Sequence, residues 1–173
     1  MRKLTHAVPR TEAAGTASLT LPYEDRRRSR LRAALDDGNE VALLLPRGTV
    51  LRDGDCLGAD DGGPAVRVRA ADETLSVART ADPLLLCRAA YHLGNRHIAL
   101  QIAPGRLAYQ HDHVLDGMVR ELGLTVTTED GPFEPEAGGY RHEGTSGHSH
   151  GHDHHHDHGH PHRHARPRGS HGE

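Results

Sequence analysis

The segment from Arg141 to the end of the chain constrains the fold most, because it contains almost no apolar side chains. It consists mainly of Gly, His, Asp, Ser, Pro and Arg, and it has neither a helical nor a strand period. Such a segment cannot bury enough apolar surface to offset the entropy that ordering it would cost. We therefore expect the hydrophobic core within residues 1–140. Residues 141–173 are predicted to be a His-rich tail that is disordered without metal.

Residues 1–71 have the pattern of short strands joined by tight turns. Residues 29–35 alternate apolar and polar side chains, residues 36–39 are rich in turn formers, and residues 40–45 are mostly apolar, which together indicate a β-hairpin. Further short strands are predicted at residues 49–52, 55–57 and 65–69. We therefore expect a small all-β domain, either a barrel or a sandwich.

Residues 72–140 alternate between strands and helices, and strands are predicted at 73–79, 97–102, 106–110 and 124–128. One helix is predicted over residues 84–93, with Asp82 as its N-cap and Pro83 at its first position. Apolar residues at helical spacing predict a second helix that ends at Gly123, and they are Val114, Leu115, Met118, Val119 and Leu122. The order β-α-β-β-α-β predicts a ferredoxin-like domain with both helices on one face, and the fold class of the chain is α+β.

The charge of the chain does not favour a nucleic-acid partner, because the formal net charge is −3 with histidine neutral. The basic run at residues 26–30 could bind phosphate. Such runs more often form a solvated strand face, and the acidic balance of the chain favours that interpretation.

Other features argue against an enzyme or a membrane protein. The chain has no P-loop and no nucleophile elbow, so we expect no enzymatic activity. Its start has no apolar signal-peptide region, and its apolar runs are too short to cross a bilayer, which predicts a cytoplasmic protein without a membrane partner. Cys56 and Cys87 form no C-x-x-C pair and are predicted to be buried structural thiols.

Histidines are concentrated in two places, and imidazole suits Ni, Cu and Zn ions. His92, His97, His111 and His113 lie within 22 residues of one another. A lone histidine is more often a surface or capping residue, but four so close together favour metal binding. His111 and His113 form an H-x-H pair, and on an extended segment both rings would lie on one side. The tract at residues 147–164 of the tail adds ten candidate histidines: His148, His150, His152, His154, His155, His156, His158, His160, His162 and His164.

The chain resembles the E family of urease accessory proteins, which are nickel metallochaperones. The resemblance extends from about Leu19 to Tyr140, and one departure is Ala99, where the family commonly has Pro. It rests on LPRGTVLRDGDCL at residues 45–57, YHLGNRHIALQI at 91–102, HDHVLDGMVRELG at 111–123 and PFEPEAGGY at 132–140.

The resemblance implies a β domain like a chaperone's peptide-binding domain, followed by a ferredoxin-like metal-binding domain through which two copies form a homodimer. It implies that His97 is the central ligand and that the two-fold axis supplies a second ligand from the partner chain. His111 and His113 correspond to peripheral ligands, His92 is a weaker candidate, and the tail histidines add further ligands.

The function that the resemblance implies is delivery of Ni(II), as cargo, to apo-urease together with other urease accessory proteins, including the GTPase. Cu(II) or Zn(II) could bind the same histidines. Two other functions fit the residues. One is general storage or buffering of nickel and other transition metals by the tail, and the other is a folding chaperone whose β domain binds peptides.

Overall fold

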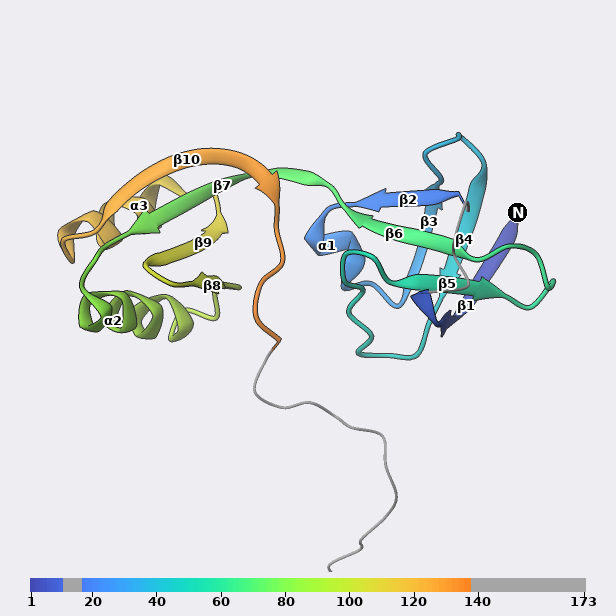
Figure 1. Cartoon of the computed structure of the whole chain (residues 1–173), viewed down its shortest axis with the longest axis horizontal. Coiled ribbons are helices and arrows are strands. Elements are labelled where there is room, and N and C mark those ends of the chain that lie inside the picture. Colours follow the sequence, from blue (N-terminus) through green and yellow to red (C-terminus); the bar gives the residue numbers. More distant parts are fainter. Residues whose placement is uncertain (11–16, 138–173) are drawn as a thin grey trace, which may run out of the picture. The chain divides into compact units, whose positions relative to one another are not determined.

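The computed structural model describes residues 1–10 and 17–137, and these residues form two successive β-sheets (Figure 1). The tail predicted at residues 141–173 lies outside the described residues, as do the ten candidate histidines within it. No helix in the described ranges is long and apolar enough to cross a membrane.

The first sheet has six strands in the order β2-β6-β5-β1-β4-β3. Its strands are β1 (Arg2–Val8), β2 (Ser18–Leu21), β3 (Arg30–Ala34), β4 (Glu40–Leu44), β5 (Cys56–Ala59) and β6 (Val66–Ala70). Its core is aliphatic, and Leu4, Leu43, Leu57 and Val66 have no exposed surface. The all-β prediction is confirmed, and side chains from both edge strands, β2 and β3, pack in the same core cluster.

The predicted hairpin is confirmed, because β3 and β4 pair antiparallel. Arg30 lies opposite Leu44 at one end of the pairing, and Ala34 lies opposite Glu40 at the other. The tight turn between them places Gly38 at φ 88°, a conformation that glycine adopts without strain. The strand predicted at residues 49–52 is wrong, because this stretch is a loop that buries Leu51 and leaves Val50 exposed.

Strands β1 and β2 were not predicted from the pattern. β1 carries only one fully buried side chain, Leu4, so it has almost no alternation of apolar and polar residues. Its place in the sheet comes from a parallel pair with β4 and an antiparallel pair with β5, both formed with residues far along the chain. β2 likewise pairs parallel with β6.

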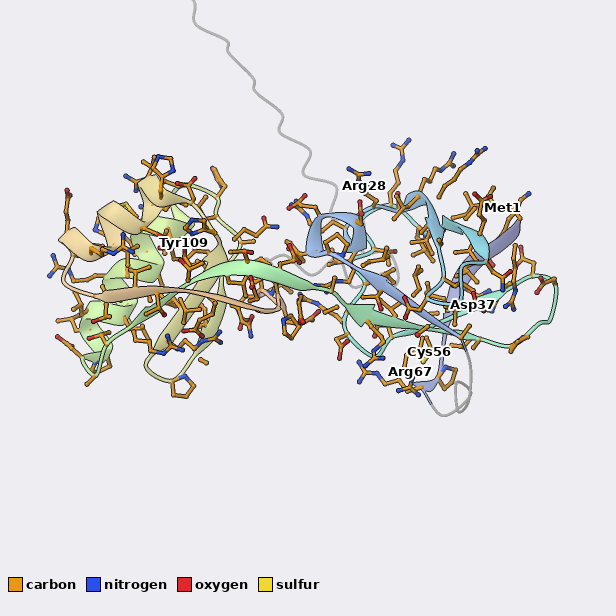
Figure 2. The ribbon with its side chains drawn as sticks, turned by 90° about the horizontal axis from the view of Figure 1, so that it is seen from above. Met1, Arg28, Asp37, Cys56, Arg67 and Tyr109 are labelled. Carbon is orange, nitrogen blue, oxygen red and sulfur yellow. The ribbon has the colours of Figure 1, made fainter. Side chains whose placement is uncertain are left out.

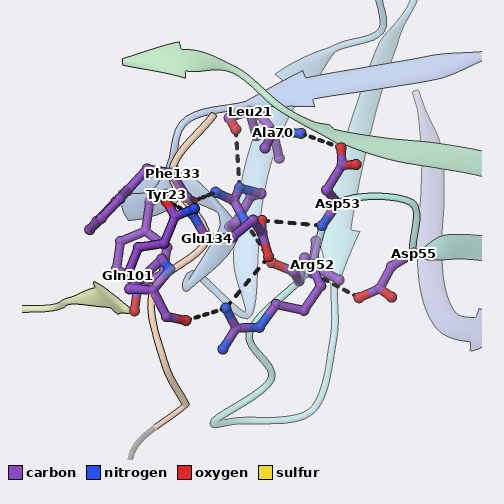
Figure 3. Close-up of polar contacts among 12 residues, drawn as sticks. Leu21, Tyr23, Arg52, Asp53, Asp55, Ala70, Gln101, Phe133 and Glu134 are labelled. Atoms are coloured by element: carbon purple, nitrogen blue, oxygen red, sulfur yellow. Dashed lines mark hydrogen bonds and ion pairs between the residues drawn. The ribbon is translucent and has the colours of Figure 1, made fainter. Parts of the chain in front are cut away.

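The prediction of a solvated strand face at residues 26–30 is wrong for Arg26, which is fully buried at the end of the short helix α1 (Tyr23–Arg26). The Arg26 guanidinium donates to the carbonyl oxygens of Leu21, Leu51 and Phe133 and pairs with Glu134 (Figure 3). A buried cation requires partners of this kind, because burial removes its water. The remaining arginines of the run are exposed, as predicted, and Arg28 projects beside α1 in Figure 2.

The second sheet has four strands in the order β10-β7-β9-β8, and every neighbouring pair is antiparallel. Its elements in chain order are β7 (Asp72–Arg79), α2 (Pro83–Gly94), β8 (Gln101–Ala103), β9 (Arg106–Gln110), α3 (His113–Glu121) and β10 (Thr125–Pro132). The predicted order of strands and helices is therefore confirmed. The strand predicted at 97–102 is wrong in its first four residues, because β8 begins only at Gln101.

The two faces of the second sheet have different partners. Ala78, Leu107 and Tyr109 pack with Leu93 of α2 and Val119 of α3 in one cluster, so both helices cover this face. The alternate residues Leu75, Val77 and Ala108 pack with Tyr23 and Phe133 on the other face. The strand period of two produces this division, because successive side chains point to opposite faces.

The prediction that both thiols are buried is confirmed for Cys56 and wrong for Cys87. Cys87 lies on α2, on the side of the helix that carries the exposed side chains of Leu84 and Tyr91. The spacing 84-87-91 places these residues on one helical face.

Candidate metal-binding site

His97 lies in the turn that ends helix α2, and its φ of 58° is left-handed. The turn has the two hydrogen bonds of a Schellman motif: Ile98 N–H donates to Leu93 O at 3.3 Å, and His97 N–H donates to Gly94 O at 2.9 Å. In this motif the left-handed residue is usually glycine, because a side chain there costs about 1 kcal/mol. A histidine at this position is therefore held at a backbone cost by a turn that leaves the residue exposed.

Helix α3 ends in the same motif with the usual residue. Leu124 N–H donates to Val119 O at 3.3 Å, Gly123 N–H donates to Arg120 O at 2.9 Å, and Gly123 has φ 101°. The same turn therefore carries glycine after one helix and His97 after the other. Glycine alone is therefore enough to form this turn, and the turn does not require the imidazole of His97.

His92 lies in the last turn of α2 and is half-buried. Its ring makes an edge-on contact with the ring of Tyr91, with the centroids 5.4 Å apart. Its carbonyl oxygen accepts a hydrogen bond of 2.9 Å from Arg96 Nη1. Only the ring contact involves the His92 imidazole, because Arg96 binds the backbone carbonyl.

His111 follows strand β9, and its ring is partly covered, with 42% of the side chain exposed. Its Nδ1 atom lies 2.9 Å from Ser76 Oγ of β7 and 3.6 Å from Asp116 Oδ2 of α3. Asp116 is almost completely buried and accepts a hydrogen bond of 2.9 Å from the hydroxyl of Tyr109, which is labelled in Figure 2. The inner nitrogen of His111 therefore faces a buried polar cluster.

The electrostatics of this cluster keep Tyr109 protonated. Burial raises the pKa of Tyr109 far above its ordinary value, and the hydrogen bond to Asp116 raises it further. A hydrogen bond from Ser76 acts in the opposite direction but does not reverse the shift. The phenol is therefore a hydrogen-bond donor to the carboxylate.

The prediction that His111 and His113 share one extended segment is wrong for His113, which is the first residue of α3. Asp112 between them is the N-cap, and its Oδ1 accepts from Val114 N at 2.8 Å and Leu115 N at 3.1 Å. The hydrogen bonds from Leu115 and then Val114 lower the pKa of Asp112. A carboxylate thus stays charged between the two imidazoles, which favours a cation there.

The predicted ligands lie at two places, the turn after α2 and the start of α3. In residues 1–10 and 17–137, no group of three His, Cys, Asp or Glu side chains is arranged to hold a metal ion. The described part of one chain therefore presents imidazoles without a closed set of ligands. The tail histidines lie outside the described part of the chain.

Sequence reasoning missed the three residues behind His111, namely Ser76, Tyr109 and Asp116. A signal was present for one of them, because Asp116 lies three residues before Val119 on the apolar stripe of α3. A carboxylate on the buried stripe of an amphipathic helix is unusual and needs a partner. No local pattern indicated Ser76, which comes from a strand 40 residues earlier in the chain.

Two family models and several known proteins match this chain. Residues 2–71 match the family model for the N-terminal domain of the UreE urease accessory protein, and residues 73–164 match the model for its C-terminal domain. The chain is 56% identical over 140 residues to the urease accessory protein UreE of Citrobacter koseri, covering 81% of this chain and 91% of that protein.

Two further relatives carry the same name. The protein of Alkalilimnicola ehrlichii is 56% identical over 140 residues, covering 81% of this chain and 85% of that protein. The protein of Pseudomonas putida strain GB-1 is 58% identical over 128 residues, covering 74% of this chain and 78% of that protein. Both family models and these identities show that the chain belongs to the UreE family of urease accessory proteins.

Proposed function

We propose that this chain binds Ni(II) as cargo and delivers it to apo-urease in the cytoplasm, together with other urease accessory proteins, including the GTPase. Family membership makes it an accessory protein and not an enzyme. The observation that carries the proposal is His97, an exposed imidazole held at a position where glycine is the usual residue. Because the turn does not need a side chain at this position, the imidazole of His97 has to be explained by a function of the ring.

We propose that the chain has three segments with different roles in this function. Residues 1–71 are an N-terminal β domain of the peptide-binding type, residues 72–140 are a ferredoxin-like domain for nickel binding and dimerisation, and residues 141–173 are a His-rich metal-binding tail. The element order from β7 to β10, the antiparallel sheet and the two helices on one face support the ferredoxin-like assignment.

An incomplete ligand set suits transfer of an ion. One imidazole per chain cannot hold Ni(II), so we infer that a partner chain supplies a second His97 across a two-fold axis. Tail histidines then complete the shell. An open set of this kind can exchange its ligands one at a time, whereas a closed structural site retains its ion. Cu(II) and Zn(II) also bind imidazole, so the supply of ions in the cell contributes to selectivity.

Association of the chain is expected to increase with nickel if His97 bridges two copies. A ligand that binds only the dimer stabilises it by about 2.7 kcal/mol at a hundredfold excess over its dissociation constant. Analytical ultracentrifugation of the protein ending at Tyr140, with and without Ni(II), measures this effect. The same protein carrying His97→Asn is the control. Equal association of both proteins at every nickel concentration would contradict the bridge.

Replacement of both His111 and His113 by Ala is expected to lower the number of nickel ions bound while leaving urease activation largely intact. The reason is that these residues lie at the start of α3, apart in sequence from the His97 turn, and are proposed as a peripheral site. Nickel stoichiometry and urease activity in cells are the two measurements. A loss of activation as large as that caused by replacing His97 would reverse the ranking of the two sites.

General storage of nickel is the second candidate function, because the tail holds twelve of the 17 histidines. A protein ending at Tyr140 is expected to bind fewer ions, to activate urease normally when nickel is plentiful and to fall behind when nickel is scarce. The physical reason is that the tail raises the local concentration of ions near His97. Urease activity across a nickel titration in cells measures the difference.

A full-length variant with Asn at all twelve histidines of residues 141–173 is the matched control, since it keeps the tail length and removes only the imidazoles. It is expected to behave like the shortened protein. Equal activity of all three proteins at every nickel level would make the tail a store unconnected with delivery. Complete inactivity of the shortened protein at high nickel would make the tail, and not His97, the essential site.

A further inference from the structure

A polar cluster lies where the helices of the second domain pack on their sheet. Ser76 of β7, Tyr109 of β9 and Asp116 of α3 are 0%, 0% and 2% exposed. Ser76 and Tyr109 are directly opposite each other in the β7–β9 pair, on the face that the helices cover. Apolar residues would pack there without the cost of removing a carboxylate from water. The cluster therefore calls for an explanation, and the group that it contacts at the surface is His111.

The chemistry of the side chains decides which atom donates and which accepts in each hydrogen bond of the cluster. An ionised carboxylate only accepts, so Tyr109 Oη donates its hydrogen to Asp116 Oδ1 at 2.9 Å. Ser76 Oγ lies 2.9 Å from His111 Nδ1, and a serine oxygen has lone pairs that can accept a hydrogen from that nitrogen. The second oxygen of Asp116, 3.6 Å from the same nitrogen, also favours a hydrogen on it.

We propose that Asp116, acting with Ser76 and Tyr109, is a positioning residue that keeps the hydrogen of His111 on Nδ1 and leaves Nε2 unprotonated as the atom that binds the metal. This inference rests on the proposed function, because it takes His111 to be a nickel ligand. A neutral imidazole has one hydrogen, so a hydrogen on Nδ1 leaves the lone pair of Nε2 free. Carboxylates that hold metal-binding histidines in this way raise the affinity of the ligand.

The geometry excludes two other roles for the cluster. In a Ser-His-Asp triad the serine and the carboxylate contact different nitrogens of the ring, whereas here both face Nδ1. Asp116 is not itself placed to bind an ion, because it is buried and its two oxygens face Tyr109, His111 and Arg120. The cluster therefore acts on the metal only through His111.

The test is the tautomer of His111, measured on the full-length protein without metal by long-range ¹H–¹⁵N NMR correlation of ¹⁵N-labelled histidine. The wild-type ring is expected to carry its hydrogen on Nδ1. Asp116→Asn and Ser76→Ala are each expected to shift the ring towards the form with the hydrogen on Nε2. Ser76→Ala keeps the carboxylate and changes little volume, so it decides the matter even where Asp116→Asn does not fold.

Arg120→Gln is the matched control, because Arg120 Nη2 lies 3.7 Å from Asp116 Oδ2 but does not contact the ring. It is expected to leave the tautomer unchanged. Nickel is then titrated, and the broadening of the His111 resonances is expected to require about 10–100-fold more Ni(II) in the Asp116 and Ser76 variants. A wild-type ring with its hydrogen on Nε2, or an Nδ1 hydrogen that survives both substitutions, would overturn the positioning role.

Failure of the proposed function gives a different result. If His111→Ala leaves the nickel stoichiometry of the full-length protein unchanged, His111 is not a ligand. The proposal that its Nε2 atom binds nickel is then wrong. The tautomer measured without metal would still decide whether Asp116 positions the ring.

Discussion

Urease activation is expected to fall roughly tenfold or more when His97 is replaced by Asn, because loss of residues that merely support a metal ligand already costs about 10–100-fold in affinity. Asn is the suitable replacement, since His97 has φ 58° and Asn tolerates the left-handed conformation better than Ala. The Schellman turn is thereby kept while the imidazole is removed. Urease activity in cells that depend on the variant at limiting nickel is the measurement.

Two further variants separate the ring from the backbone. His97→Gly is expected to lose activation to the same extent and to leave the free energy of unfolding unchanged or raised, since glycine is the usual residue of this turn. His6→Asn replaces another exposed histidine, on β1, and is expected to activate urease normally. Normal activation by both His97 variants would refute the central role given to this ring.

Replacing Arg26 by Met is expected to lower the free energy of unfolding by about 3 kcal/mol, the range found when one partner of a buried ion pair is removed. The substitution takes the donor from the carbonyl oxygens of Leu21, Leu51 and Phe133 and leaves Glu134 without its buried partner. Urea denaturation followed by circular dichroism measures the change. We expect the segment after β10 to detach first, because Phe133 and Glu134 in that segment are the partners that lose Arg26.

Arg28→Met is the matched control for Arg26. Arg28 is an exposed arginine two residues along, paired with Asp25 at 3.3 Å. Exposed pairs of this kind contribute about 0–1 kcal/mol, so the control is expected to unfold almost like the wild type. Equal losses in the two variants would show that burial does not distinguish Arg26, and that the run of arginines acts as one charged surface.

Local signals explain what could be predicted about the fold. Asp82 caps α2 as expected, with its side chain accepting from Leu84 N at 2.8 Å and Leu85 N at 3.3 Å, and Pro83 is the first residue of the helix. Gly123 ends α3 in the left-handed conformation. Caps, turn residues and apolar periods act within a few residues of the chain, so the structures that they form can be predicted from the sequence.

The errors have a common cause, which is pairing between distant residues. β1 has one fully buried residue and becomes a strand only beside β4 and β5. Arg26 has the same charge as its neighbours, and only partners as far as 108 residues along the chain make it a buried residue. The pattern around residue 97 predicted a strand, but the hydrogen bonds of the helix end extended the turn to that residue.

The sequence by itself determined the β3–β4 hairpin, the succession of strands and helices in the second domain, and the histidines that are candidates for nickel binding, because composition and periodicity act locally. Only the tertiary structure decided that His97 occupies the left-handed position of a turn, that Arg26 is buried, and that Ser76 and Asp116 meet at one nitrogen of His111. Those contacts join strands and helices distant in sequence, and the energy of a buried polar group depends on which partners the fold brings to it.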